Sequence, residues 1–328
     1  MDWFKEAKYG LMIHWGIYTM AAGEWKGRRI ELDMPRAETG GFNVGEWLQR
    51  RYMIPIREYE KLAEAFCPVF FDAREWAKAA SDWGMKYMVV TAKHHDGFAM
   101  FDSKVDVYNV VKKTPFSRDI IKELSQACKE YGLKFGVYYS QALDWHEKNG
   151  GDYWPLNTVG GFQQANLWDF PENMKKDYRE YFERKVKGQV KELLTNYENV
   201  DMIWFDGADR AIPRECSEEL YYFVKELKPE CLVNTRVGHG FGDVKSFDDN
   251  EFPDGSFVEG LYETPATLNG NWGYVAHDQR WKEAGEVLRL KEHLNSRGVN
   301  YLLNVGPDPI GRIPAPAKRI LDEVAKRL

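Results

Sequence analysis

The sequence predicts an α/β fold in the form of a (β/α)8-type TIM barrel, regular or irregular. Three observations support this prediction. Segments of strand and helix character alternate along all 328 residues, and about eight of them have the pattern of short buried strands. Polar and ionisable residues follow most of these strands directly, as at the catalytic end of a barrel. No GxGxxG motif follows the first strand, which argues against a dinucleotide-binding open sheet.

The strand predictions rest on apolar and β-branched runs that end in polar or turn-forming residues. The run Met85–Ala92 ends in this way, and so does Leu133–Ser140. We expect the eight strands at residues 9–18, 85–92, 133–140, 201–207, 231–236, 244–247, 257–262 and 299–305.

The helix predictions rest on apolar residues spaced by three and four, and Asn43 with Glu46 fits a capping box. No linker or repeat interrupts the alternation, so we expect one catalytic domain over residues 1–328. We expect helices from about residue 43 and over residues 73–83, 115–131, 171–197, 216–228, 281–296 and 314–328, with a long loop at 21–42.

The composition excludes several classes of partner. The net charge is −6 and both signs are interspersed, so we expect neither a nucleic-acid surface nor an anionic-membrane surface. No apolar run reaches the roughly 18 residues of a membrane span. The N-terminus has no apolar signal-peptide core, so we expect a cytoplasmic protein unless a signal was removed, which would make it extracellular or periplasmic. The four scattered cysteines are expected to be buried free thiols.

The stretch Asp201–Gly207 combines a buried strand with a carboxylate at its tip. By the period of two, Met202, Trp204 and Asp206 share one face of this strand. A buried charge is costly unless it is paired, so this arrangement suits a site better than a core. The alternative is that Asp206 and Gly207 form only a turn.

Similar residues end other predicted strands. The carboxyl ends of barrel strands converge on one mouth, where catalytic groups are expected. Six polar side chains at five such ends favour a site over simple turns. The side chains are His14, His94, His95, Tyr139, Asp206 and Arg236.

The motifs that carry these residues resemble glycoside hydrolase family 29, the retaining α-L-fucosidases, from Trp3 to about Gly311. So many separate motifs in one order make the resemblance specific. The matching segments are Trp3–Phe4, Gly10–Gly16, Gly45–Trp47, Tyr87–Phe98, Gly136–Ser140, Asp144–Trp145, Trp204–Gly207, Asn234–Arg236, Glu263–Tyr274 and Tyr301–Pro307.

The resemblance implies an exo-acting α-L-fucosidase with Asp206 as its nucleophile, no cofactor, and a fucosylated oligosaccharide or glycoconjugate as its partner. Neutral histidines can donate to and accept from ring hydroxyls, and tryptophans can hold the apolar face of a sugar. The resemblance assigns fucose binding to His14, Glu46, Trp47, His94, His95, Tyr139, Trp204 and Arg236.

Two residues after the predicted strand 231–236 are candidates for the acid/base. Glu251 has acidic neighbours, which favour the protonated form of a carboxyl group, and it is our first choice. Glu263 is the alternative, although it could instead be a structural carboxylate. Asp248 ranks third. A solvated acidic loop is the other interpretation of Glu251.

Two other functions stay open, and one departure from the family is plain. A non-catalytic fucose-binding protein could use the same fold. A metal-dependent hydrolase would need His14, His94, His95 and Asp206 to meet at one ion, whereas consecutive strand residues point to opposite faces. Many family members continue into a C-terminal β-sandwich, and we expect this chain to lack it. The resemblance leaves the linkage cleaved and the oligomeric state open.

Overall fold

The structure is a computed structural model that describes residues 2–32, 43–151, 158–159, 162–172, 176–207 and 212–328. Its main sheet has eight strands, and every pairing between them is parallel. The strands are β1 (Tyr9–Ile13), β4 (Tyr87–Lys93), β5 (Lys134–Tyr139), β8 (Val200–Phe205), β9 (Leu232–Val233), β10 (Lys245–Ser246), β11 (Tyr262–Thr267) and β12 (Val299–Val305).

The sheet closes into a barrel in which chain order is spatial order. The last strand, β12, pairs with the first, β1. The two edge strands of the hydrogen-bonded ladder are β9 and β10. A single parallel bridge between Asn234 and Val244 joins these two edges. Val244 N donates to Val233 O at 3.0 Å, and Thr235 N donates to Val244 O at 2.8 Å. We call this junction of β9 and β10 the seam.

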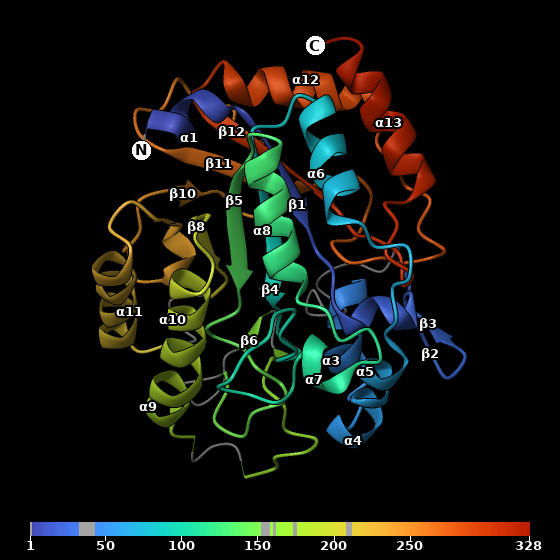
Figure 1. Ribbon diagram of the computed structural model, residues 1–328, viewed down its shortest axis with the longest axis vertical. Helices are drawn as coiled ribbons and strands as arrows, with labels where there is room; N and C mark the ends of the chain where they lie inside the picture. The colour runs from blue at the N-terminus through green and yellow to red at the C-terminus, as the bar shows by residue number, and fades with distance from the viewer. Residues whose placement is uncertain (1, 33–42, 152–157, 160–161, 173–175, 208–211) are drawn as a thin grey trace.

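Helices cover the outside of the barrel (Figure 1). They are α1 (Asp2–Ala7), α3 (Leu48–Arg51), α4 (Ile56–Tyr59), α5 (Lys61–Ala65), α6 (Ala73–Asp82), α7 (Val110–Lys113), α8 (Ile120–Glu130), α9 (Tyr178–Tyr181), α10 (Lys187–Thr195), α11 (Arg214–Leu227), α12 (Ala284–Asn295) and α13 (Ala315–Ala325). The shorter elements are the 3-10 turns η1 (Ile17–Ala21), η2 (Gly45–Trp47) and η5 (Thr235–Val237), a π turn η4 (Phe182–Val186), and the hairpins β2–β3 (Glu24–Trp25, Arg28–Arg29) and β6–β7 (Thr158–Val159, Phe162–Gln163).

The barrel is irregular on one side. Residues 234–261 are all described, and between β9 and β11 they contain only η5 and β10, without an α-helix. Two of the helices of a regular (β/α)8 barrel are therefore replaced by loops at the seam. The prediction of a (β/α)8-type barrel is confirmed, in its irregular form.

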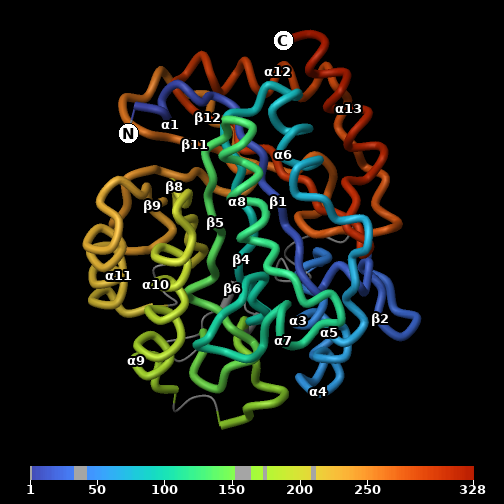
Figure 2. Tube along the Cα trace, viewed as in Figure 1, coloured from blue at the N-terminus to red at the C-terminus, as the bar shows by residue number. Residues whose placement is uncertain are grey.

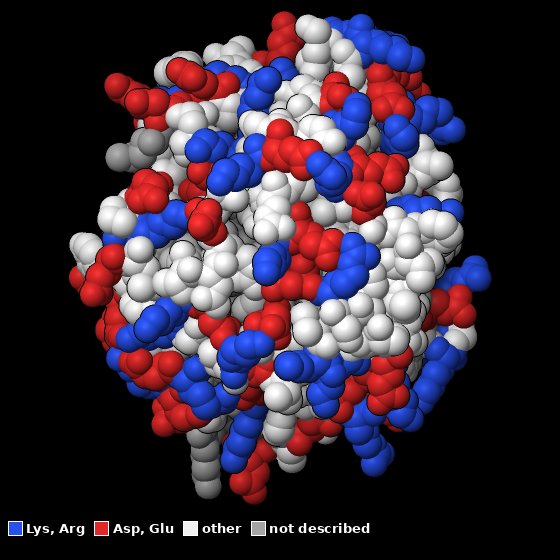
Figure 3. All heavy atoms as spheres, viewed as in Figure 1, with Lys and Arg blue, Asp and Glu red and all other residues white. Residues whose placement is uncertain are grey.

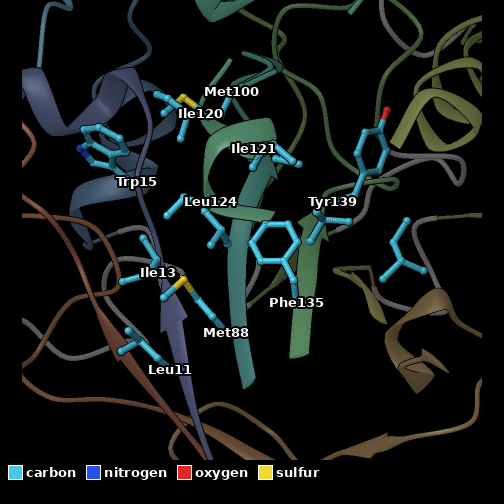
Figure 4. Packing of buried hydrophobic residues seen from close by; sticks show 14 of the residues in the cluster. Leu11, Ile13, Trp15, Met88, Met100, Ile120, Ile121, Leu124, Phe135 and Tyr139 are labelled. Carbon is cyan, nitrogen blue, oxygen red and sulfur yellow. The ribbon is translucent and has the colours of Figure 1, made fainter. Parts of the chain in front are cut away.

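Two apolar layers hold the barrel together. The inner layer fills the barrel with side chains such as Met202, Trp204 and Leu302, and Phe4 of α1 packs into the same cluster. The outer layer lies between strands and helices. Figure 4 shows part of it, where Ile121 and Leu124 of α8 face the strands. Met202 and Trp204 point inward while Ile203 and Phe205 pack outward, as the period of two predicts.

Several predicted boundaries are wrong. The strand expected at 257–262 is instead β11, which contains Pro265. Proline is disfavoured in a central strand because it lacks the N–H donor. It is tolerated here because β10 pairs only with Tyr262 and Glu263, so its ladder has ended before Pro265. The carbonyl of Pro265 accepts a hydrogen bond from Asn250 N at 3.0 Å instead.

Three further predictions need correction. The first strand ends at Ile13 and not near Tyr18, because the chain turns at Gly16 into η1. The described helix within 171–197 begins at Tyr178 and contains the π turn, while residues 173–175 lie outside the described residues. Part of the predicted loop 21–42 is the β2–β3 hairpin, and residues 33–42 also lie outside the described part. All four cysteines are free, but Cys67 is exposed.

The surface agrees with the charge pattern of the sequence. Figure 3 shows acidic and basic side chains interleaved over the face in view. Among the described residues, no helix combines the length and the apolar character that crossing a membrane would require.

Candidate active site

Asp206 follows β8 directly and lies at the barrel mouth with its side chain 24% exposed. Its Oδ2 accepts a hydrogen bond from the Tyr138 hydroxyl at 2.6 Å, and His95 Nε2 lies 3.6 Å from the same oxygen. Arg236 Nη1 donates to Oδ1 at 3.3 Å. Burial alone would raise the pKa of Asp206, but Arg236, His95 and the Tyr138 hydrogen bond outweigh it and hold that pKa below its ordinary value. Asp206 is therefore an ionised carboxylate with access to the mouth.

The tyrosine at this site is Tyr138, and the prediction of Tyr139 is wrong. Tyr138 pairs in register with Trp204, so both side chains point into the barrel. Tyr139 points to the other face, where its hydroxyl donates to Gln189 Oε1 of α10 at 2.8 Å. Figure 4 shows Tyr139 among the outer-layer residues that include Phe135. The sequence Tyr138-Tyr139 carries no signal of its own for this choice; the register with Trp204 decides it.

Three histidines form the neutral wall of the site. Burial is the largest cause that lowers the pKa of His14 and of His95 to about 4. Burial, with His95 and His14 nearby, also lowers the pKa of His94 well below its ordinary value. His14 Nδ1 lies 2.8 Å from Asn304 Oδ1, while Asn304 Nδ2 donates to the Trp272 carbonyl. This fixes Nδ1 of His14 as a donor and leaves Nε2 as an acceptor.

The adjacent histidines lie together because they are not part of a regular strand. The pairing of β4 with β5 shifts register between Thr91 and Lys93, and β4 ends at Lys93. The rings of His94 and His95 are therefore only 4.2 Å apart, contrary to the alternation expected of strand residues. Even so, no group of three or more His, Cys, Asp or Glu side chains within the described residues has the arrangement to hold a metal ion.

Tryptophan rings line the site next to these histidines. Trp47 contacts His95 edge to face at 4.9 Å between ring centroids, and Trp204 stacks on Tyr138 at 5.4 Å. Sequence reasoning gave no role to Trp272, whose ring lies 5.0 Å from His14, or to Trp145, whose ring contacts both Trp47 and His95. Both are in motifs that the family resemblance had already marked.

Glu46 is buried behind this wall. Its Oε2 accepts a hydrogen bond from Gly273 N at 2.8 Å, so it does not serve as the capping-box partner of Asn43. Burial raises the pKa of Glu46 to about 7, although the hydrogen bond from Gly273 opposes the shift. The carboxyl group can therefore exchange a proton near neutral pH.

Arg236 links Asp206 to the loop that follows β10. Its Nη2 donates to Phe247 O at 3.0 Å and to Asp249 Oδ1 at 2.6 Å. The guanidinium also lies over the ring of Trp204, 4.8 Å from its centroid. Arg236 therefore contacts two carboxylates and an aromatic ring at once, and Asp249 is a site residue that the sequence analysis did not rank.

The two predicted acid/base residues lie in different surroundings. Glu251 is exposed, and its Oε2 accepts a hydrogen bond from Asp248 N at 2.9 Å. Glu263 is fully buried and accepts from Trp204 Nε1 at 2.6 Å, from Ser246 Oγ at 2.8 Å and from Tyr87 at 3.2 Å. Its contacts are those of a residue that positions Trp204.

A second carboxylate, Asp144, lies behind the site. Its Oδ2 is 3.1 Å from Lys93 Nζ and 3.0 Å from Lys185 Nζ, and all three side chains are fully buried. Lys185 comes from the π turn η4 and also pairs with Asp106. The next residue, Trp145, donates its backbone N–H to the His95 carbonyl at 2.7 Å. This ion network therefore backs the part of the wall that Trp145 and His95 form.

Taken together, an ionised carboxylate at a barrel mouth, neutral hydrogen-bonding groups and tryptophan rings define the class of a sugar-cleaving hydrolase. A family model described as alpha-L-fucosidase matches residues 1–328. The chain belongs to the alpha-L-fucosidase family, a family of glycoside hydrolases.

Related structures and sequences agree. The alpha-L-fucosidase AlfC from Lactobacillus casei, solved with alpha-L-fucose, is 46% identical with a TM-score of 0.91, covering 99% of this chain and 97% of that one. A variant of AlfC with one aspartate changed to alanine, solved with Fucα(1,6)GlcNAc, is 45% identical with a TM-score of 0.90, covering 99% and 97%. A putative alpha-L-fucosidase of Caenorhabditis elegans is 28% identical over 99% of this chain. The chain spans 64% of the length of that relative.

Proposed function

We propose that this chain hydrolyses terminal α-L-fucose from fucosylated glycans by double displacement, with Asp206 as the nucleophile. The observation that carries the proposal is the ionised, partly exposed Asp206 carboxylate held by Arg236 and Tyr138. The carboxylate attacks the anomeric carbon while an acid protonates the departing glycosidic oxygen, which gives a β-L-fucosyl-enzyme. Water activated by the same acid/base then releases α-L-fucose.

The neutral wall recognises the sugar in this mechanism. Neutral imidazoles at His14, His94 and His95 can each donate to or accept from a hydroxyl group without adding charge next to Asp206. An imidazolium there would pair with the nucleophile and weaken its attack. The tryptophan rings supply apolar surface for the methyl group and the hydrophobic face of fucose.

The acid/base assignment rests on the loop after β10. Asp249 shares the Arg236 guanidinium with Asp206, whereas no hydrogen bond or ion pair described for Glu251 or Glu263 joins either of them to Asp206 or Arg236. A retaining glycosidase needs two carboxyl groups about 5–5.5 Å apart. Asp249 therefore replaces Glu251 as our first candidate, with Glu251 and Glu263 as the alternatives to be tested beside it.

The related AlfC variant solved with Fucα(1,6)GlcNAc suggests the substrate class. Because identity to it is 45% over nearly all of this chain, we propose that α-1,6-linked fucose on N-acetylglucosamine is among the substrates cleaved.

The proposal is tested by fucose release from 4-nitrophenyl α-L-fucoside and from 1,2-, 1,3-, 1,4- and 1,6-linked fucosyl oligosaccharides, with a chelator present. Release by the wild type but not by Asp206→Ala supports it. Binding of fucose without any turnover by the wild type supports the non-catalytic alternative, and activity lost to the chelator supports the metal-dependent one.

Azide separates the two carboxyl roles by product stereochemistry. In Asp206→Ala, azide should replace the nucleophile and give β-L-fucosyl azide. In the acid/base variant, azide should attack the fucosyl-enzyme and give the α-azide. Asp249→Ala, Glu251→Ala and Glu263→Ala are compared in this assay. An α-azide from Glu251→Ala alone would return the role to Glu251.

A further inference from the structure

A cavity of about 620 Å³ lies beside the β2–β3 hairpin, separate from the residues described so far. Apolar side chains, including Met20 and Leu62, form part of its lining, and Trp25 of the hairpin adds a half-buried aromatic ring. Its size is within the range of pockets that bind small organic molecules. The strand arrows of Figure 1 point to the end of the barrel at which the hairpin lies, and Figure 2 shows β2 in the same place. The cavity is therefore on the same end of the molecule as the mouth.

Close backbone packing fixes the hairpin to the wall of this cavity. Gly23 begins the hairpin with a φ of +81°, and a Cβ there would lie 2.6 Å from Val275. Ala276 N donates to Ala22 O at 3.0 Å, and the ring of His277 hydrogen-bonds to Ile30 O through Nε2 at 2.9 Å. The cavity is thus a built feature in which two distant chain segments are held together.

The charges around the cavity are already balanced. Arg29 pairs with Glu24 at 2.8 Å, and Lys26 pairs with Glu58 at 2.6 Å. An ionic ligand would have to break these pairs. A neutral, hydroxyl-rich ligand can instead accept from the cations and donate to the carboxylates while both pairs stay intact. An aromatic ring beside such polar groups offers apolar area together with hydrogen bonds, which is what a sugar ring requires.

The same two segments also form the wall of the active site. Tyr18 of η1 contacts His94 edge to face, and Met20 of the same turn lines the cavity. Gly273 donates to Glu46, and Ala276, three residues later, lines the cavity. Three residues span at most about 11 Å, so the cavity begins within about 11 Å of the residue that holds Glu46 behind the site wall.

We propose that this cavity is a saccharide subsite that binds the sugar units beyond the fucose in larger glycans. The proposal rests on the function proposed above. Trp25 is the stacking platform, and Arg29 and Glu24 are specificity residues for the hydroxyl groups. The subsite should therefore lower KM for extended substrates and leave KM unchanged for substrates with no glycan attached.

The test compares three substrates: 4-nitrophenyl α-L-fucoside, Fucα(1,6)GlcNAc, and a larger core-fucosylated oligosaccharide. Trp25→Ala should raise KM for the large substrate about 5- to 10-fold and leave the aryl fucoside within about 2-fold, because one aromatic contact is worth roughly a tenfold change in affinity. Arg29→Ala, at an exposed position, should act in the same direction with a smaller effect. Tyr222→Ala removes an exposed aromatic from α11 and serves as the matched control.

Each outcome decides between the two proposals. If the wild type cleaves nothing, the proposed function fails. If it cleaves all three substrates and both variants keep the wild-type KM for the large one, the subsite is wrong. Equal losses on all three substrates in both variants would also overturn the subsite, because they would indicate general damage to the fold. If Trp25→Ala fails to fold, Arg29→Ala decides alone.

Discussion

Asp206 and Asp144 are two buried carboxylates that follow neighbouring strands and solve the same electrostatic problem differently. Burial alone would raise the pKa of each, yet neighbouring positive charge holds both below the ordinary value. Asp144 has two buried lysines, a tyrosine hydroxyl and a backbone N–H around it, and its side chain is 0% exposed. Asp206 has one guanidinium at 3.3 Å and keeps 24% of its side chain exposed.

The difference shows that ionisation alone does not make a carboxylate accessible to a substrate. The side chain of Asp144 is 0% exposed and enclosed by its partners, so its oxygens cannot reach a substrate. The oxygens of Asp206 also have close partners, the Tyr138 hydroxyl at 2.6 Å and Arg236 at 3.3 Å, but the side chain stays 24% exposed at the mouth. The first arrangement contributes to structure, and the second leaves electron density available for attack.

Replacing Asp206 sharpens the comparison most. Asp206→Ala should lower kcat by at least about 10⁴-fold, because the proposed covalent intermediate forms on this carboxylate. The melting temperature should stay close to that of the wild type, since Arg236 keeps Asp249 as a partner. Steady-state kinetics and calorimetry on the same preparation measure both. A large loss of stability would show that Asp206, like Asp144, has a structural role.

Asp144→Ala should show the opposite pattern. It leaves Lys93 with no carboxylate partner among its described ion pairs, and such losses cost about 3–5 kcal/mol of unfolding free energy. Urea unfolding measures this loss. The matched control is Asp144→Ala with Lys93→Met, which removes the lysine left unpaired and should recover part of the loss, while Lys185 keeps Asp106 and Glu147 as partners. Wild-type stability in the single variant would contradict the structural role.

The neutral histidines predict a pH dependence of stability. The folded-state pKa of His14 and of His95 is about 4, below the unfolded value of 6.5. Between these values the unfolded chain binds protons that the folded chain does not, so stability falls as pH decreases from 6.5 to 4. The loss is on the order of 3 kcal/mol per histidine. Unfolding free energies of the wild type and of His14→Gln across this range should converge at the acidic end.

Arg236 is the main group that keeps the pKa of Asp206 low despite burial. Arg236→Met should raise the pKa of Asp206, which moves the acidic limb of the kcat/KM profile to higher pH and lowers the rate at neutral pH by about 10²-fold. Arg236→Lys keeps the charge and should retain the position of the acidic limb better than Met does. An unchanged limb in Arg236→Met would show that Tyr138 and His95 suffice.

The sequence predicted the barrel and the inward position of Asp206 because both follow from regular patterns. Alternating strands and helices define the ring, and the period of two places Asp206 with Trp204 on the inner face. The choice between Tyr138 and Tyr139 could not be made in the same way. It depends on the register between β5 and β8, which no local pattern encodes.

The strand misplaced at 257–262 and the choice of acid/base both lie where local patterns give no answer. The strand β11 contains Pro265, which is disfavoured in a central strand, and sequence patterns do not show that the neighbouring β10 is two residues long. Asp249 and Glu251 are nearly adjacent carboxylates in one loop. Only the fold of their loop turns Asp249 toward Arg236 and Glu251 back to the chain.

The seam is the junction that closes the barrel. One backbone bridge joins β9 to β10, and Arg236 reinforces it by reaching across to Phe247 and Asp249. Local opening should therefore begin there, with amide hydrogen exchange faster in residues 232–247 than in β1, β4 or β12. A sugar bound against Asp206 and Arg236 would stabilise the seam and slow that exchange. Substrate binding and closure of the barrel at the seam are then thermodynamically coupled, and product can leave when the seam opens.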